Sequence, residues 1–479
     1  MRIAAATWCA LWYLTLIMAV DGASLAAEPA LPKRPNLVLI LIDDLGYGDI
    51  GPFGSKLNRT PNLDRMAAEG MKLTSFYCAP VCTPSRASFM TGCYPKRVSL
   101  PNVLFPAAAV GISAGEHTLP ELLKARGYAT MCVGKWHLGD QPEFLPTHHG
   151  FDHYLGLPYS NDMGGNWDGR PGAEPAPPKK TGGKSTSSSA AKRPPLPLLR
   201  DETVVETISP EGQDKLTARY TEEALKFIQK HKDGPFFLYL PHTAVHLPHH
   251  PGAAFRGKSK NGIYGDWGEE VDASAGRVLD TLRNLKLSER TLVFFTSDNG
   301  GVRKIASNGP LRGYKGTTFE GGMREPTIAW WPGKIPAGTV CDAVTANLDI
   351  LPTFVKLAGG TAATDRKLDG LDIWPLLSGQ SQRSPHEAFF YFNGNNLAAV
   401  RSGPWKLEVS GMLYNLDADI GETKDVAAKQ PAEVKKLRAL LDQIRADLGD
   451  KSPGPGCRPA GQVSNPQPLL LDKSKGVAK

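Results

Sequence analysis

Two aspartates stand side by side where a run of apolar residues ends. Asp43-Asp44 follows Asn36–Ile42, and Asp298-Asn299 follows a second apolar run further along the chain. Adjacent carboxylates repel each other unless a cation neutralises them. With the amide oxygen of Asn299 they form an all-oxygen set, which suits a hard divalent ion, Ca²⁺ before Mg²⁺, and suits zinc poorly. Each aspartate alone could instead cap the turn that follows it, but the pairing of the two segments favours a metal site.

A cysteine lies at the start of an expected helix. Cys82-Thr83-Pro84-Ser85-Arg86 precedes Ala87–Met90, and Pro84 is favourable at a first helical position, so Cys82 should lie at the helix N-terminus. Backbone N–H groups attract an anion there. Arg86, one turn on, would neutralise and orient a nucleophile or a bound oxyanion. An isolated cysteine is usually a buried structural thiol, so this inference depends on the residues around it.

Basic residues follow other apolar runs. Lys135 and His137 come directly after Ala129–Val133, and four histidines fall within Pro241–His250 after another run. In open α/β sheets, ligands bind beyond the carboxyl ends of the strands. We therefore expect these side chains and the aspartates to converge on one crevice.

Alternating strand and helix patterns must position these residues. Continuous apolar runs indicate buried strands of a parallel sheet: Asn36–Ile42, Ala129–Val133, Pro235–Leu240, Leu292–Thr296 and Thr327–Trp331. Apolar residues at helical spacing fall between them, in Pro61–Glu69, Leu119–Arg126, Asp214–Lys230 and Trp267–Leu285. The alternation predicts an α/β fold with helices on both faces of a sheet.

The composition along the chain predicts five segments. Residues 1–26 have the pattern of a signal peptide, with an uncleaved anchor as the alternative. Residues 33–379 form the large α/β domain, interrupted by a disordered insertion at 170–200 that is rich in Pro, Lys, Ser and Gly. Residues 380–450 show short strands and an amphipathic helix, which predicts a small α+β domain with an antiparallel sheet. Residues 451–479, rich in Pro and Gly, are expected to be a flexible tail.

The bulk properties fit an exported globular protein, periplasmic or secreted. The 479 residues are 41% hydrophobic and 22% charged, and the net charge of +7 would help to draw in an anionic substrate. Of the seven cysteines, the six after Cys9 show no CxxC pair and no zinc-ligand spacing, which excludes a disulfide scaffold. No segment after the signal pattern is long and apolar enough to suggest stable membrane insertion.

Three segments resemble signature sequences of the type I sulfatases, which depend on formylglycine. Cys82–Gly92 looks like the signature CxPSRxxxxTG, Gly127–Gly139 resembles GYxTxxxGKWHLG, and Lys315–Pro326 is a third match. The resemblance covers Pro35 to Leu448, and its pattern is closest to arylsulfatase A and N-acetylgalactosamine-6-sulfatase. It implies an alkaline-phosphatase-like sandwich, in which helices flank a large mixed, mostly parallel sheet, followed by the small C-terminal domain.

The resemblance also implies a nucleophile and a metal site. A formylglycine-generating enzyme would oxidise Cys82, and the hydrated aldehyde would attack sulfur with one hydroxyl and release sulfate with the other. The implied Ca²⁺ ligands are Asp43, Asp44, residue 82, Asp298 and Asn299. Arg86 matches the residue that orients the diol.

The remaining roles fall on residues that bind sulfate or move protons. Lys135 and Lys315 match sulfate-binding lysines, and Lys315 would also protonate the leaving oxygen. His137 matches the histidine that contacts the diol. His246 matches a second histidine that binds the substrate, with His242 as the alternative and with His249 and His250 expected at the surface or the substrate rim. Ser160 resembles a serine that contacts sulfate.

The predicted function is therefore hydrolysis of sulfate monoesters, either aryl sulfates or sulfated carbohydrates. One alternative is a phosphate or phosphonate monoester hydrolase of the same superfamily, since these esters share a tetrahedral shape. Another is a non-catalytic binder of sulfated glycans, but the complete set from Asp43 to Lys315 argues against it. No nucleic-acid partner is expected.

Overall fold

A computed structural model describes residues 34–164, 194–362 and 365–470, and these described residues belong to one compact unit. Within the described residues the main feature is an eleven-stranded sheet with the order β11-β2-β10-β9-β1-β8-β4-β5-β6-β7, and β12 pairs with β2. Its strands are β1 Asn36–Ile42, β2 Met71–Tyr77, β4 Ala129–Val133, β5 His153–Gly156, β6 Pro197–Arg200, β7 Thr203–Thr207, β8 Phe236–Pro241, β9 Thr291–Ser297, β10 Arg324–Trp330, β11 Thr339–Cys341 and β12 Thr345–Ala346.

The sheet is mixed but parallel at its centre. Strands β9, β1, β8, β4 and β5 run parallel to one another, while β10 runs antiparallel to both β9 and β2, and β6 runs antiparallel to β5. The apolar run Thr327–Trp331 predicts a parallel strand, and that direction is wrong. The chain between β9 and β10 stays at the carboxyl end of β9, so β10 starts there and runs back.

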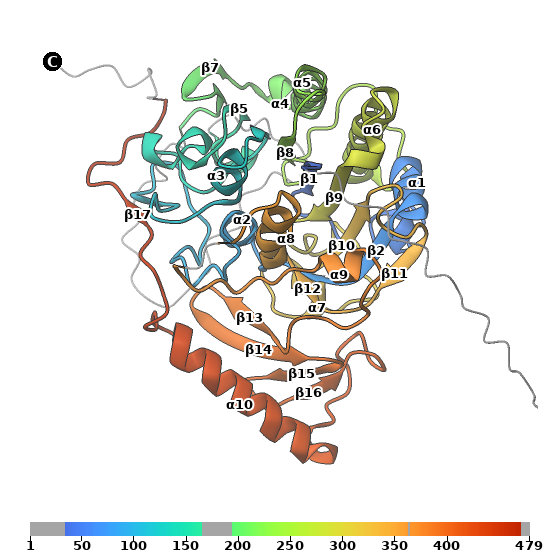
Figure 1. Ribbon diagram of the computed structural model, residues 1–479, viewed down its shortest axis with the longest axis vertical. Coiled ribbons are helices and arrows are strands. Elements are labelled where there is room, and N and C mark those ends of the chain that lie inside the picture. The colour runs from blue at the N-terminus through green and yellow to red at the C-terminus, as the bar shows by residue number, and fades with distance from the viewer. Residues whose placement is uncertain (1–33, 165–193, 363–364, 471–479) are drawn as a thin grey trace, which may run out of the picture. The chain divides into compact units, whose positions relative to one another are not determined.

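Strand β1 shows why the apolar runs are continuous. Leu37, Leu39 and Leu41 pack into the core on one face, and Val38, Ile40 and Ile42 pack into the core on the other. Helices α2 Cys82–Thr91, α3 Leu119–Lys124 and α8 Ile350–Leu357 cover the first face, and α1 Pro61–Glu69, α5 Leu216–Lys230 and α6 Gly262–Asn284 cover the second (Figure 1). The predicted helix–sheet–helix sandwich is therefore confirmed.

Local sequence explains where these helices begin. In α3 the Thr118 side chain accepts a hydrogen bond from the backbone of Glu121, whose carboxylate accepts one from the Thr118 backbone, a reciprocal capping box. Helix α2 begins at Cys82, so Pro84 is its third residue and not its first as expected. A proline is still tolerated there because the first-turn N–H groups have no partner within the helix.

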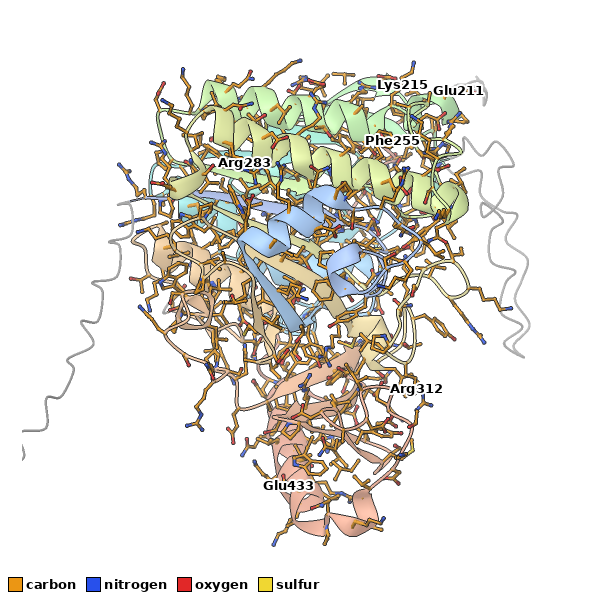
Figure 2. The ribbon with its side chains drawn as sticks, turned by 90° about the vertical axis from the view of Figure 1, so that its right-hand side faces the viewer. Glu211, Lys215, Phe255, Arg283, Arg312 and Glu433 are labelled. Atoms are coloured by element: carbon orange, nitrogen blue, oxygen red, sulfur yellow. The ribbon has the colours of Figure 1, made fainter. Side chains whose placement is uncertain are left out.

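The C-terminal part contains the predicted antiparallel sheet. Its strands are β13 Phe389–Asn393, β14 Asn396–Ser402, β15 Trp405–Glu408 and β16 Leu413–Asn415, paired in that order. Helix α10 Pro431–Leu448 packs against this sheet, at the end of the molecule away from α5 and α6 (Figure 2). Short helices α4 Pro210–Gln213, α7 Glu320–Met323 and α9 Trp374–Leu377 complete the set in the described residues.

Two expected segment boundaries need correction. The end of the insertion at 170–200 is ordered, because Leu196, Leu198 and Leu199 are fully buried and carry strand β6 into the large sheet. Residues 451–470 of the expected flexible tail pack against the large domain. Strand β17 Gly461–Gln462 pairs with β3 Val110–Gly111, and Arg458 forms an ion pair with Glu116. Residues 1–33, 165–193 and 471–479, which include the signal pattern, lie outside the described residues.

No helix among the described residues is long and apolar enough to cross a membrane.

Candidate active site

Four neighbouring parallel strands end at one edge of the sheet. In the order β9-β1-β8-β4, each strand is followed within a few residues by a polar group of the candidate site: Asp298 after β9, Asp43 and Asp44 after β1, His246 after β8, and Lys135 and His137 after β4. The structure therefore brings together residues that are far apart in the sequence. They gather at the carboxyl edge, where ligands bind in a sheet of this type.

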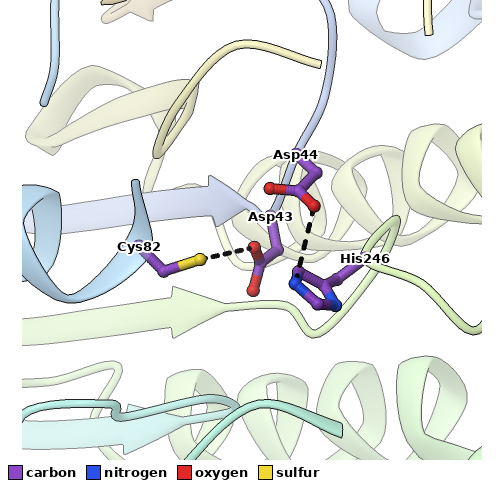
Figure 3. Close-up of side chains that lie close together, drawn as sticks. All are labelled: Asp43, Asp44, Cys82 and His246. Atoms are coloured by element: carbon purple, nitrogen blue, oxygen red, sulfur yellow. Dashed lines mark hydrogen bonds and ion pairs between the residues drawn. The ribbon is translucent and has the colours of Figure 1, made fainter. Parts of the chain in front are cut away.

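Cys82 enters this edge from the first turn of α2. Its Sγ lies 3.4 Å from Asp43 Oδ1, and its side chain points from the helix start toward the carboxylates (Figure 3). Burial, and after it the Asp43 carboxylate, raises the pKa of the Cys82 thiol well above its usual range. The unmodified residue is thus a neutral thiol, which is a poor nucleophile.

Arg86 lies one turn further along α2 and is fully buried. Its guanidinium donates to Asp298 Oδ2 at 2.9 Å, to Asp43 Oδ2 at 3.2 Å and to the Lys135 carbonyl at 2.6 Å. A planar guanidinium can satisfy several acceptors at once, so Arg86 fixes the relative positions of the ends of β1, β4 and β9.

Lys135 and Ser160 continue the cluster toward His246. The Lys135 ammonium donates to Asp43 Oδ2 at 2.5 Å and to Ser160 Oγ at 3.2 Å, and Ser160 Oγ lies 3.3 Å from His246 Nδ1. Burial opposes ionisation of both partners, but Lys135 and the other nearby cations lower the pKa of Asp43 well below its usual range. The buried pair is therefore held in its charged form.

Asp44 contacts the side chains on the other side of the cluster. Lys315 Nζ lies 2.7 Å from Asp44 Oδ1, Asn299 Nδ2 donates to the same oxygen at 2.8 Å, and His246 Nε2 lies 3.6 Å from Asp44 Oδ2. Figure 3 shows His246 turned toward this carboxylate. The amide oxygen of Asn299 is buried and has no hydrogen-bond partner, so it is an acceptor without a donor.

His137 is held by a backbone contact. Its Nε2 lies 2.9 Å from the Leu104 carbonyl, which requires Nε2 to carry the proton. Its Nδ1 is then an acceptor, and it is buried without a partner. Burial, followed by the charges of Lys135 and Arg86, lowers the pKa of His137 well below its usual value, so the ring is neutral.

The other histidines after β8 lie elsewhere. His242 is fully buried, and its Nε2 contacts Ser274 Oγ on α6 at 3.2 Å. His249 and His250 were expected at the surface or the rim, and this expectation is wrong, because both are buried against the ring of Trp267. Of the four, His246 lies in the cluster.

The cluster has the donor set of a metal site. Ligand atoms of Asp43, Asp44, Cys82 and His246 all lie within 4.8 Å of one another. Asn299 adds its orphaned amide oxygen, and Asp298 lies beside Arg86. Three carboxylates here face three cations, Arg86, Lys135 and Lys315, so a divalent ion would leave an excess of positive charge that favours an anionic substrate.

Two supports of the site have no counterpart in the sequence analysis. The backbone of Leu104 joins Thr83, whose Oγ1 accepts from the Leu104 N–H at 3.2 Å, to His137. Lys406, on strand β15, donates to the Thr318 carbonyl at 2.8 Å in the loop that carries Lys315. A backbone carbonyl leaves no pattern in a sequence, and Lys406 is remote from every motif.

Solved structures share the fold of the chain, which is the expected alkaline-phosphatase-like sandwich. Residues 35–360 match the family model described as "Sulfatase", and residues 314–447 match the one described as "N-sulphoglucosamine sulphohydrolase, C-terminal". The chain belongs to the sulfatase family and is a sulfuric ester hydrolase.

Similar proteins include sulfatases that are named after different substrates. The chain is 42% identical to N-acetylgalactosamine-6-sulfatase from Sus scrofa, over 82% of this chain and 75% of the relative. It is 43% identical to arylsulfatase A from Bos taurus, over 83% of this chain and 78% of the relative. The solved structure of Ps i-CgsB in complex with k-i-k-neocarrahexaose matches with a TM-score of 0.75 at 30% identity. The match covers 88% of this chain and 95% of the solved one. A phosphonate monoester hydrolase, SpPMH from Silicibacter pomeroyi, shares the fold at 18% identity and a TM-score of 0.62. The match covers 86% of this chain and 95% of the solved one.

Proposed function

We propose that the protein cleaves sulfate monoesters with a formylglycine derived from Cys82 and with a bound divalent cation, Ca²⁺ before Mg²⁺. The observation that carries the proposal is the position of Cys82, at the first residue of α2 with its Sγ 3.4 Å from Asp43 Oδ1. A neutral thiol buried among carboxylates has no evident role as it stands. A hydrated aldehyde at the same position would supply an oxygen nucleophile and a second hydroxyl to release sulfate.

The residues present fit the cation. Asp43, Asp44, Asp298 and Asn299 offer oxygen ligands, residue 82 adds its own, and the unpartnered Asn299 Oδ1 is the group that most needs a cation. When bound, the cation would offset negative charge on the sulfate group. Addition of CaCl₂ should raise the Tm of the wild-type protein but not that of Asp44→Asn, and equal shifts in both would argue against this site.

The surrounding side chains divide the remaining work. Arg86 and Lys135, both fully buried, would orient the nucleophile and hold the sulfate oxygens. His246 and Lys315 converge on Asp44 and are partly exposed, which suits donation of a proton to the leaving oxygen. His137, neutral and with a free Nδ1, would accept a proton from the hydroxyl that expels sulfate.

Maturation and location belong to the same proposal. Residue 82 is only 2% exposed in the folded chain, so a formylglycine-generating enzyme would need to act before α2 packs. The signal pattern in residues 1–26 supports export to the periplasm or beyond the cell.

A comparison of esters tests the proposed reaction. Protein produced with a formylglycine-generating enzyme should have a higher kcat/KM on 4-nitrophenyl sulfate than on 4-nitrophenyl phosphate or a phenyl phosphonate ester. Cys82→Ala should keep its circular dichroism spectrum and lose at least about 10²-fold in kcat. A preference for the phosphorus esters would support the alternative hydrolase, and full activity in Cys82→Ala would refute the nucleophile.

A further inference from the structure

The cluster is most exposed at Lys315 and His246, and we call this side the opening of the site. Cys82, Asp43, Arg86 and Lys135 are at most 2% exposed, whereas the side chain of Lys315 is 21% exposed and that of His246 is 11% exposed. Under the proposed function, a sulfate ester with its sulfur beside residue 82 would extend its alcohol part toward this exposed side, past Lys315. What surrounds Lys315 then determines which substrates fit.

The loop that carries Lys315 is strongly basic. Residues 300–319, between β9 and α7, contain Arg303, Lys304, Arg312 and Lys315 and no aspartate or glutamate. The chain returns on itself here, because the Lys315 N–H donates to the Gly301 carbonyl at 3.1 Å. The first half of the loop thus lies directly beside the lysine at the opening.

This first half is firmly held. Asn308 exchanges two hydrogen bonds with the backbone of Gly301, at 2.8 and 3.0 Å, and the Ser307 N–H donates to the buried Asp49 carboxylate at 3.0 Å. The Arg303 guanidinium lies over the ring of Tyr314, 5.2 Å from its centroid. Arg303 is thereby fixed against the residue that directly precedes Lys315.

Arg303 and Lys304 present their positive charges to solvent. Both side chains are exposed, and neither forms an ion pair with any residue in the part of the chain that the structure describes. Asp49, the acid beneath the loop, is buried and accepts hydrogen bonds from Ser307, Gly46 and Tyr264. Arg312 differs, since it stacks on Phe319 and donates to the Glu422 carbonyl (it is labelled in Figure 2).

We propose that Arg303 and Lys304 bind a second anionic group, a sulfate or a carboxylate, on the sugar next to the one that is desulfated. This inference rests on the proposed function and narrows it: the substrate is a polyanionic glycan and not an isolated neutral alcohol sulfate. An anion bound here would sit at the outer edge of the opening, with Tyr314 between it and Lys315. The contact is exposed, so it should act mainly on KM and depend on salt.

The test compares two substrates in one double variant, Arg303→Gln/Lys304→Asn. Asparagine is chosen because Lys304 has a φ of 66°, a left-handed conformation that asparagine tolerates. On a chondroitin sulfate disaccharide, which carries sulfate and carboxylate, kcat/KM should fall about fivefold or more at low salt, mostly through KM. The difference should vanish in about 1 M NaCl, where charges are screened beyond about 3 Å. On 4-nitrophenyl sulfate kcat/KM should stay within about twofold.

Lys230→Ala is the matched control, because this exposed lysine ends α5 at the opposite edge of the sheet. Equal losses on both substrates, or unchanged kcat/KM on the disaccharide, would overturn the proposal. Binding of a chondroitin sulfate tetrasaccharide to Cys82→Ala, with and without the double change, gives a reading that needs no turnover. If neither sulfate ester is hydrolysed the proposed function fails, whereas tetrasaccharide binding that resists the double change refutes the anion subsite alone.

Discussion

His246 and Lys315 are the side chains best placed to act on the leaving group, because both contact Asp44 and both are partly exposed. A sugar alkoxide leaves only with a proton, whereas nitrophenolate does not need one. We predict that His246→Ala lowers kcat/KM on a sugar sulfate at least about tenfold more than on 4-nitrophenyl sulfate. His242→Gln is the control, since His242 contacts Ser274 and not the cluster. Leaving-group dependence in the control but not in His246→Ala would show that the assignment is wrong.

The candidate site was predicted from the sequence almost residue by residue, because each side chain follows a strand end or belongs to a contiguous motif. Cys82, Arg86, Lys135, His137, Ser160, His246, Asp298, Asn299 and Lys315 all lie with the two aspartates at one sheet edge. Their catalytic and ligand roles stay predictions. What the sequence could not supply is the support by backbone groups, such as the Leu104 carbonyl, which any residue type at that position would provide.

Helix α6 braces the loop that carries His246. Glu270, on α6, accepts a hydrogen bond from the Gly252 N–H at 2.7 Å, and burial raises the pKa of this carboxyl from 4.5 to about 7. The folded protein therefore binds more protons than the unfolded chain between about pH 4.5 and pH 7, so its stability falls as pH rises through this window.

We predict that Glu270→Gln reduces this pH dependence. An amide oxygen can still accept from Gly252 but carries no charge. Between pH 5 and pH 8, the free energy of unfolding should therefore fall by up to about 2 kcal/mol less in the variant than in the wild type. Urea unfolding at the two pH values measures it. Glu433→Gln on α10, at a half-buried position, is the control for the exchange of a carboxylate for an amide. Identical pH profiles for Glu270→Gln and the wild type would contradict the prediction.

Elements with a strong pattern were predicted closely, and the others were not. The bounds of β1, β4 and α1 match the sequence patterns, because these segments have continuous apolar runs or clear helical spacing. Strand β2 was missed, since MKLTSFY mixes polar and apolar residues and reads as neither a buried nor an alternating strand. The strands β5, β6 and β7 are short and lie toward one edge of the sheet, where tertiary pairing decides the structure.

At the scale of the whole molecule, a buried charge network joins the C-terminal sheet to the large domain. Lys406 lies 3.1 Å from Glu320 and 2.7 Å from Glu422, and Glu320 also accepts hydrogen bonds from Tyr77 and Tyr391. Burial opposes ionisation of Glu320, but Lys406 and the arginines nearby lower its pKa to about 2. The network begins five residues after Lys315, so it links the C-terminal sheet to the opening of the site.

Loss of this lysine should destabilise the entire protein. Lys406→Met would leave two buried carboxylates short of a cation, and we predict a loss of about 3–5 kcal/mol in the free energy of unfolding. Lys367→Met is the control, because Lys367 is 62% exposed in its ion pair with Asp447 and should contribute less than about 1 kcal/mol. Calorimetry and urea unfolding measure both. Equal, small losses would mean that the network does not stabilise the junction.

The most direct test of the whole account is the chemical identity of residue 82 in active protein. Trypsin should release the peptide 73–86, which contains Cys78 and Cys82, and fragmentation separates the two positions. Among molecules that turn over sulfate esters, we predict that CHO has replaced CH₂SH at residue 82 and that Cys78 is unchanged. The activity of different preparations should rise in proportion to the converted fraction. Full activity in protein whose residue 82 is entirely cysteine would contradict the account.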